Sequence, residues 1–502
     1  MMISLPVEIL HRIFEHCETP IPFQDWEQGY SKWEPQHPRP RDLIALSKVC
    51  HRFRSVAHPL IYRTLAFRSE WRAKDEFLDT FTHALCADPL VGNNIRGLRV
   101  DSWVSNFDVD YFAKKLGASP KHLDERQKRW LKRWVEAESG NVALVLLLLA
   151  PRLRILDYTD ILSSIRGIAA YLSGRQDVED DHLAMALNGK GDIDDDNVAD
   201  DTGPETASED GDGNNESGDV PVGQLLGPVS GNPMTLLREV RLRHGRYLLK
   251  RVRFIEGVLL NPGLEILRLF AFRWTKEEVR AMKWNNAVSN ITTLQLKNCL
   301  IDARGLANAL RRCRLRHLHI VLAPVIRMLA DADGDGVNFD EMGVVFRRYG
   351  QSLESLDFET IAFREYYVVD GHIGPLSALS RLRSLKISVE ELGEFNEEDE
   401  DELKMGLRTS LPPTLESIHI RPSHSKATRV ALTLLMDEAH SALRTVEVEV
   451  DDENRNEDDP QDLVVPGWSK SFRTDMISRD DTELVDFYSC RIVVFSRDAE
   501  AH

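Results

Sequence analysis

The chain has 502 residues, of which 42% are hydrophobic and 29% are charged, and its formal net charge is −18. This length exceeds one ordinary globular core, so it predicts roughly two to four domains or one extended repeat array. The negative charge argues against a nucleic-acid-binding protein, because contacts to phosphate groups need clustered lysine and arginine residues.

Most of the negative charge lies in one segment. Residues 176–220 hold sixteen acidic residues and one basic residue, Lys190, so they carry −15 of the −18. Such an acidic, glycine-rich composition predicts a disordered insert, which we bound at residues 176–230. Residues 394–403 and 451–462 are predicted to be shorter acidic loops. We interpret all three as solvated linkers; alternatively, the long insert folds back on a basic surface and competes with a ligand.

The cysteines and the apolar segments indicate a cellular compartment. None of the six cysteines has CxxC spacing, which suits a reducing compartment better than a disulfide framework. The N-terminus lacks the features of a secretory signal. The most apolar run, Val142 to Ala150, is too short for a bilayer, which needs about 20 residues. We therefore expect a cytoplasmic or nuclear protein without a membrane partner.

The first 65 residues read as short helices. Ser4 is a candidate cap for a first helix, and a proline-rich loop follows at residues 18–40. Asp42 is expected to cap a second helix that continues to Phe53, and a third short helix is expected after it. The apolar residues on the face of the first helix are Leu5, Ile9, Leu10, Ile13 and Phe14.

A short unit of the form apolar-x-x-apolar-x-apolar recurs through the rest of the chain. Each copy predicts a strand whose first, fourth and sixth residues face inward, and stacked copies bury a continuous core. Helices are expected between the strands, around Leu306 and Leu310 and at residues 425–440. The copies begin at Ile95, Leu153, Leu237, Leu264, Ile291, Leu315, Leu353, Leu382, Leu415 and Leu443, and nine of them carry Arg or Glu directly after this first residue.

The N-terminal residues resemble an F-box. The resemblance rests on Leu5-Pro6-Val7-Glu8-Ile9-Leu10 and on the segment from Asp42 to Ala57, and the end of the segment is similar to F-boxes of fungal proteins. The family implies docking on a Skp-type adaptor, and through it on cullin and RING subunits. The residues that the resemblance assigns to adaptor binding are Leu5, Pro6, Ile9, Leu10, Ile13, Leu43, Leu46, Val49 and Phe53.

The recurring unit resembles the degenerate leucine-rich repeats that often follow a fungal F-box. The predicted fold is therefore α/β: an all-α F-box followed by a curved leucine-rich-repeat solenoid with parallel strands and a disordered acidic insert. The expected boundaries are 1–65 for the F-box, 66–175 for the first repeats, 176–230 for the insert, and 231–502 for the remaining repeats and a C-terminal cap.

The predicted function is a non-catalytic one: substrate recognition for an SCF-type ubiquitin ligase. Repeats of this kind usually capture a protein substrate on their concave face. A basic patch there would suit an acidic or phosphorylated segment. The candidate substrate-binding residues are Arg241, Arg243, Arg268, Gln295, Lys297, His319, Lys386 and His419.

Residues 331–341 resemble a calcium-binding EF-hand loop. Asp331, Asp333 and Asp335 have the spacing of its first ligands, but the loop is one residue short and Met342 stands where the bidentate glutamate belongs. We interpret the segment as a turn between repeats and predict no metal and no cofactor. The sequence also lacks the common catalytic motifs. Two alternatives stay open: a scaffold that binds the adaptor without serving ubiquitination, and a calcium-modulated binding module.

Overall fold

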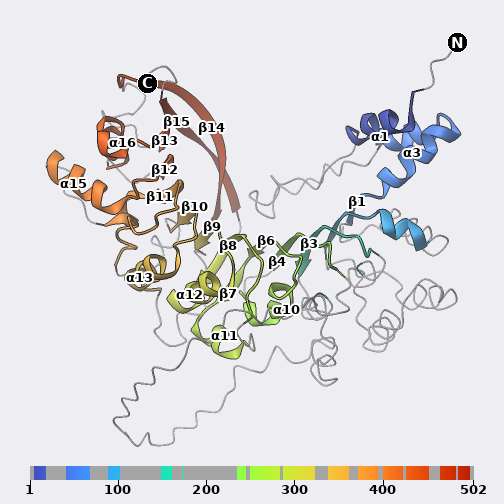
Figure 1. Cartoon of the computed structure of the whole chain (residues 1–502), viewed down its shortest axis with the longest axis horizontal. Helices are drawn as coiled ribbons and strands as arrows, with labels where there is room; N and C mark the ends of the chain where they lie inside the picture. The colour runs from blue at the N-terminus through green and yellow to red at the C-terminus, as the bar shows by residue number, and fades with distance from the viewer. Residues whose placement is uncertain are drawn as a thin grey trace, which may run out of the picture.

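The chain combines an N-terminal group of helices with a large sheet of mostly parallel strands, here described from a computed structural model (Figure 1). No helix in the described part of the chain is long and apolar enough to cross a lipid bilayer. The structure describes residues 5–17, 41–67, 89–101, 147, 150–160, 172, 234–244, 249–282, 287–322, 337–360, 371–393, 399–421, 426–450, 464–481 and 484–497.

Among the described residues, three helices, which we call the helical module, precede the sheet. They are α1 (Val7–Glu15), α2 (Arg41–Ser47) and α3 (His51–Ile61). The prediction of one helix from Asp42 to Phe53 was wrong, because α2 ends at Ser47 and Cys50 caps a new helix by accepting a hydrogen bond from the Phe53 N–H at 3.4 Å. Asp42 accordingly lies in the first turn of α2 and does not cap it. Ser4 lies outside the described residues, and α1 begins after Pro6.

The sheet runs in chain order, and each strand as far as β13 pairs in parallel with the next one on the main path. Because its two end strands do not meet, the sheet is open. The parallel strands are β1 (Thr64–Phe67), β2 (Gly97–Asp101), β3 (Ile155–Asp160), β4 (Glu239–His244), β6 (Ile266–Phe270), β8 (Thr293–Ile301), β9 (His317–Leu322), β10 (Ser355–Glu359), β11 (Ser384–Ser388), β12 (Ser417–Arg421) and β13 (Thr445–Val450).

The last two strands form a long antiparallel hairpin that the sequence analysis did not predict. β15 (Leu484–Arg497) pairs with β13, and β14 (Trp468–Asp481) pairs with β15 over its whole length. Two further short strands, β5 (Lys250–Arg251) and β7 (Phe272–Trp274), pair with each other, and β7 also pairs with the end of β8. The hairpin therefore covers the far edge of β13.

The recurring apolar unit coincides with the strands. Its fourth residue is aligned across the sheet from β2 to β13, and each of these residues is at most 2% exposed. The aligned residues are Leu98, Leu156, Val240, Leu267, Leu294, Leu318, Leu356, Leu385, Ile418 and Val446. Side chains alternate between the two faces of a strand, so this register puts one apolar face against the core along the whole sheet.

Helices lie on the outer side of the arc that the strands form (Figure 1). The predicted helix around Leu306 is confirmed, as is the predicted helix within residues 425–440. The longer helices bury apolar residues against the strands in one continuous core. The helices on this side are α10 (Glu256–Leu259), α11 (Lys276–Ala281), α12 (Ala303–Arg312), α13 (Phe339–Tyr349), α15 (Glu400–Ser410) and α16 (Lys426–Met436).

Short 3-10 helices supplement them. They are η3 (Pro89–Asn94), η5 (Val252–Ile255), η6 (Val389–Leu392) and η7 (Glu438–His440). The packing of α13 on β10 shows how the layers meet: Phe339 and Phe346 of α13 meet Phe358 of β10 edge to face, at ring-centroid distances of 5.9 and 6.0 Å. These contacts fix α13 to the strand beneath it.

Two predicted loops contain the start of a helix. Residues 394–403 were predicted as an acidic loop, but α15 begins at Glu400, and the Asp399 carboxylate accepts hydrogen bonds from the N–H groups of Asp401 and Glu402. Acidic residues are favourable there because the N-terminus of a helix carries partial positive charge. Asn338 caps α13 in the same way, so residues 338–341 begin a helix. The long insert, residues 451–462, and Asp331, Asp333 and Asp335 lie outside the described residues.

Candidate functional site

The helical module has its own small core. One face of α1 supplies Leu10 and Phe14, and Phe14 meets Phe53 edge to face with the ring centroids 5.2 Å apart. Leu43 of α2 is fully buried between them and α3. The buried members are Leu10, Phe14, Leu43, Val56, Ala57, Leu60 and Ile61. This core accounts for only one apolar stripe of α1.

A second apolar stripe of α1 faces outward. Leu5, Ile9 and Ile13 recur every four residues, and between 42% and 47% of each is exposed. Val7 is 47% exposed, and Val49, after the end of α2, is 64% exposed. An amphipathic helix needs one apolar stripe to fold against its neighbours, so a second stripe on a short helix is typical of a surface that a partner covers. We call these five residues the outer stripe.

The nine predicted adaptor-binding residues divide into three groups. Leu5, Ile9, Ile13 and Val49 belong to the outer stripe, and Pro6 is exposed beside them. Leu46 and Phe53 are partly buried, while Leu10 and Leu43 lie inside the core of the module. Val7 was not predicted, although it lies within the matching motif. It is two residues from both Leu5 and Ile9, and this spacing does not place it on the same row of a helix.

The sheet presents a polar face opposite its helices, and two networks of charged side chains lie on it. The first network lies on β2 to β6. Asp157 has one carboxylate oxygen 3.4 to 3.8 Å from guanidinium nitrogens of Arg99, Arg241 and Arg243. Glu239 has one oxygen 2.8 Å from Nε of both Arg241 and Arg268. Arg241 is fully buried, so the predicted basic patch includes a guanidinium that is enclosed and paired with carboxylates.

The second network lies on β10 to β13. The Arg421 guanidinium is 2.6 Å from a carboxylate oxygen of Asp357 and 3.0 Å from one of Glu359. The two ring nitrogens of His419 lie 2.7 and 2.6 Å from carboxylate oxygens of Glu447 and Glu449. The Lys386 ammonium is 3.2 Å from Glu449, which makes this carboxylate a shared partner of two strands.

These contacts change the acidity of the carboxylates. Burial opposes the charged form of Glu449, but the hydrogen bond from His419 and the charge of Lys386 outweigh it and lower the pKa of Glu449 to about 2. Burial likewise opposes ionisation of Asp357, and the charge of Arg421 lowers the pKa of Asp357 to about 2. Both carboxylates are therefore ionised at neutral pH.

The structure brings together only some of the predicted substrate-binding residues. Arg241, Arg268, Gln295 and His319 are aligned on neighbouring strands, and Lys386 and His419 are aligned further along. Arg243 and Lys297 lie in the next row, separated by Phe270. The list of candidates held only basic and neutral residues, so it left out the acidic residues that pair with them. The side chains two positions away, such as Glu449 and Arg421, share the same face and could have been found by alternation.

Metal binding gains no support from the described residues, which include no group of three or more His, Cys, Asp or Glu side chains able to hold an ion. Cys299 and Cys313 are buried, which raises the pKa of both thiols to about 12. Thiols of this kind are protonated at neutral pH and make poor nucleophiles.

The arrangement is that of an α/β protein in which a helical module is joined to an open, parallel-rich sheet. A family model described as F-box-like matches residues 2–68, the part of the chain that forms the helical module and β1. The chain therefore carries an F-box-like domain at its N-terminal end. No curated protein matches the chain in sequence.

Proposed function

We propose that the protein is the substrate-recognition subunit of an SCF-type cullin-RING ubiquitin ligase. F-box domains generally bind Skp-type adaptors, and the F-box-like domain at residues 2–68 supports the same role here. The observation that carries the proposal is the outer stripe, because it leaves apolar side chains exposed on the domain whose relatives dock through apolar contacts.

The sheet region would hold the substrate. We propose that it is a solenoid of degenerate leucine-rich repeats of the kind found behind fungal F-boxes. The in-register parallel strands, the outer helices and the open ends of the sheet support this architecture. The polar face would then contact a protein substrate through the side chains that remain accessible, such as His319 and Lys386, which are 26% and 32% exposed.

The proposed mechanism needs no catalytic residue in this chain. One end binds the adaptor with its cullin and RING subunits, and the other binds the target protein. Tethering raises the effective concentration of target lysines near the charged conjugating enzyme. The reaction would take place in the cytoplasm or nucleus.

The adaptor contact can be tested by a pull-down of purified Skp-type adaptor with the full chain. A Leu5→Asp, Ile9→Asp double variant places two charges in the outer stripe, so we expect adaptor binding to weaken at least about 100-fold. A matched control, Val344→Asp with Met405→Asp, changes two residues that are 54% and 60% exposed on α13 and α15, and should bind as the parent does.

The opposite result would be equally informative. If the parent chain is folded by circular dichroism and does not bind the adaptor, the ligase proposal fails. If it binds the adaptor but a reconstituted mixture with cullin and RING subunits forms no larger complex, the protein is a scaffold that uses its F-box for assembly.

A further inference from the structure

A ladder of twelve side chains, eleven of them charged, runs along one edge of the sheet, for the most part just before the strands begin. From Arg96 to Arg444, each member follows the first apolar residue of a repeating unit, and the backbone N–H groups of that member and of the next residue donate to the carbonyl of the preceding member. Arg63 precedes the first of these units, and Arg497 of β15 donates its N–H to the Arg444 carbonyl at the other end. Neighbouring members are therefore about 5 Å apart, the spacing between hydrogen-bonded strands. In order, the members are Arg63, Arg96, Arg154, Arg238, Glu265, Thr292, Arg316, Glu354, Arg383, Glu416, Arg444 and Arg497.

From Arg238 onward, this ladder is largely neutralised by ion pairs between adjacent strands. The guanidinium and carboxylate groups are 2.8 Å apart in Arg238–Glu265, 3.7 Å apart in Arg316–Glu354 and 3.4 Å apart in Arg383–Glu416. Opposite charges on neighbouring strands stabilise a sheet, and like charges destabilise it. The alternation thus removes the electrostatic cost of aligning charged residues at one edge.

The ladder begins differently, with Arg63, Arg96 and Arg154 in succession. Glu15 of α1 accepts a hydrogen bond from Arg63 at 3.0 Å. Arg154 makes no side-chain ion pair or hydrogen bond within the described part of the chain, and the Nη1 of Arg96 donates to the carbonyls of Asn93 and Ile95. Among the described residues at this place, three guanidinium groups lie near one carboxylate, that of Glu15.

The charges act on one another. Burial lowers the pKa of Arg96, and the positive charges of Arg152, Arg154 and Arg63 lower the pKa further. Three other positive charges therefore lie near Arg96. An anion at this position would lower the energy of the cluster, since it supplies the charge that carboxylates supply on the later strands.

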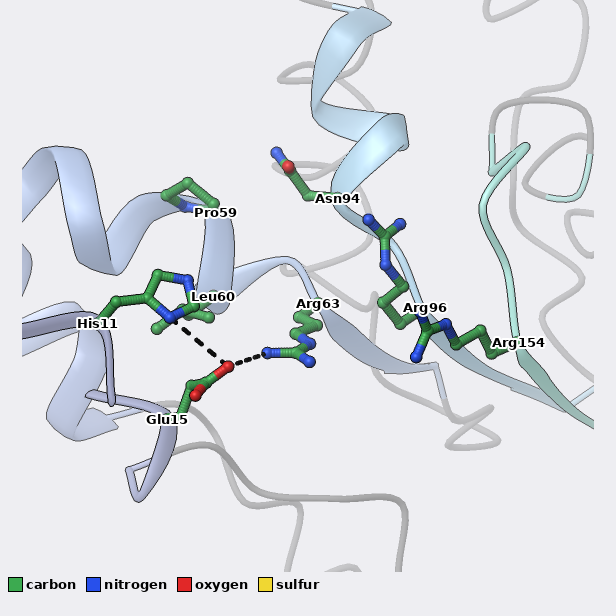
Figure 2. A pocket seen from close by; sticks show the side chains of 8 residues that line it. All are labelled: His11, Glu15, Pro59, Leu60, Arg63, Asn94, Arg96 and Arg154. Carbon is green, nitrogen blue, oxygen red and sulfur yellow. Dashed lines mark hydrogen bonds and ion pairs between the residues drawn. The ribbon is translucent and has the colours of Figure 1, made fainter. Parts of the chain in front are cut away.

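These arginines also line a cavity of about 320 Å³ between the helical module and the first strands. Figure 2 shows Arg154 reaching from its strand toward Arg63, with Arg96 beside them and Glu15 between His11 and Arg63. The cavity is therefore concave, lined by basic groups and large enough for a small ligand, since ligand sites start at about 300 Å³. The remaining lining residues are Pro59, Leu60 and Asn94.

We infer that this cavity binds a phosphate monoester. The lining carries two more guanidinium groups than carboxylates, and a phosphate monoester carries about −1.5 to −2 charges at pH 7. Guanidinium groups bind phosphate oxygens through paired hydrogen bonds, and Arg96 and Arg154 come from adjacent strands that hold their backbones in register. The cavity is lined by His11 and Glu15 of α1, whereas Ile9 and Ile13 of the outer stripe lie on another row of this helix. The phosphate site therefore does not depend on adaptor docking.

The test measures binding of phosphate probes to the full chain by isothermal titration calorimetry. The probes are inorganic phosphate, glucose 6-phosphate, and a short phosphoserine peptide with its unphosphorylated form. We expect a phosphorylated probe to bind, with an affinity that falls as salt rises. Arg154→Ala and Arg96→Ala should each weaken binding about 10-fold or more, because each removes a charge-assisted hydrogen bond.

Arg383→Ala is the matched control, since it removes an arginine of the same ladder that is paired with Glu416. It should leave phosphate binding unchanged. Tighter binding of the phosphopeptide than of glucose 6-phosphate would identify a protein ligand, and the reverse order would identify a small metabolite; both results support the site.

Two results would overturn the inference. One is the absence of binding by every phosphorylated probe, and the other is equal binding by the parent and by an Arg96→Ala, Arg154→Ala double variant. A melting scan separates loss of the site from loss of the fold: phosphate should raise the melting temperature of the parent and leave that of the folded double variant unchanged.

Discussion

Two glycines in successive helices lie closer to a neighbouring backbone than any other residue type allows. A Cβ atom on Gly305 of α12 would lie 1.8 Å from the carbonyl oxygen of Trp274, and one on Gly343 of α13 would lie 1.8 Å from that of Ile373. Real Cβ atoms do not approach a carbonyl oxygen so closely. These two positions therefore set how tightly the outer helices pack on the adjoining connections.

Gly343→Ala should destabilise the protein, against the usual trend for helices. In an open helix, alanine is more favourable than glycine by about 0.5–1 kcal/mol. Here the added methyl group has to displace the backbone at Ile373, so we expect a loss of about 1–3 kcal/mol in the free energy of unfolding, measured with urea. Val344→Ala, at a 54% exposed position of the same helix, is the control and should change stability little. A stabilised Gly343→Ala variant would contradict the close approach.

At the scale of residues, the sequence motif identified the module but not the direction of each side chain. Ile9 and Leu10 both match the F-box pattern, yet Ile9 is 42% exposed and Leu10 is 4% exposed. The motif assigns both to adaptor binding. Which one faces outward depends on where α3 packs, and that contact joins residues about 50 positions apart. The sequence pattern of α1 alone therefore does not show which of the two side chains faces outward.

Among the elements, β11 to β13 are joined by side chains as well as by backbone hydrogen bonds. His419 of β12 lies between Glu447 and Glu449 of β13, and Lys386 of β11 reaches Glu449. Glu449 is only 5% exposed, so little solvent screens these pairs. The network thus connects three strands at the polar face.

This network predicts a loss of stability in acid. The folded pKa of Glu449 is about 2, below its ordinary value of 4.5, so its contribution is complete above pH 4.5 and is lost as the pH falls toward 2. The contribution should be on the order of 3 kcal/mol. The free energy of unfolding can be measured by chemical denaturation between pH 2.5 and 7. Glu449→Gln should lower this free energy at pH 7 and make it depend less on pH. Glu265→Gln, at a half-exposed surface pair, should leave the slope unchanged.

If the unfolding free energy of Glu449→Gln depends on pH as steeply as that of the parent, then Glu449 is not the carboxylate that causes the loss of stability in acid. The pKa of Asp357 is also lowered to about 2. The unfolding free energy of the parent should therefore fall more steeply in acid than one carboxylate alone would cause. An Asp357→Asn, Glu449→Gln double variant measures the two contributions together.

Strands were easier to predict than the helix boundaries and the hairpin. The strands repeat one apolar pattern, and each copy reinforces the others. The division between α2 and α3 was missed because the cap is the sulfur of Cys50, and the common capping residues are Ser, Thr, Asp and Asn. The hairpin of β14 and β15 departs from the repeat in both spacing and direction, so a search for further copies did not find it.

For the whole molecule, the antiparallel hairpin determines what happens at the end of the sheet. Without it, the backbone groups of β13 would form an open edge, and such edges pair with other chains. Phe495 and Val493 of β15 are also buried in the core, so the hairpin belongs to the folded unit.

Removing residues 451–502 should therefore cause self-association. We expect a lower melting temperature and oligomers in size-exclusion chromatography with light scattering, because the edge of β13 and its apolar neighbours become exposed. Removing only residues 498–502 is the control and should leave a particle of the same mass as the parent. A stable, monomeric 1–450 fragment would show that β13 needs no covering strand.

The order of the sheet also bears on how the chain folds. β12 and β13 are joined by residues 422–444, whereas β3 and β4, which are just as closely paired, are joined by residues 161–238. Closing the longer connection costs about 1 kcal/mol more chain entropy, since each doubling of length adds about 0.6 kcal/mol. Short connections also give low contact order, which speeds folding. The strands from β4 onward can thus assemble as a nucleus, and β1 to β3, together with the helical module, join it last.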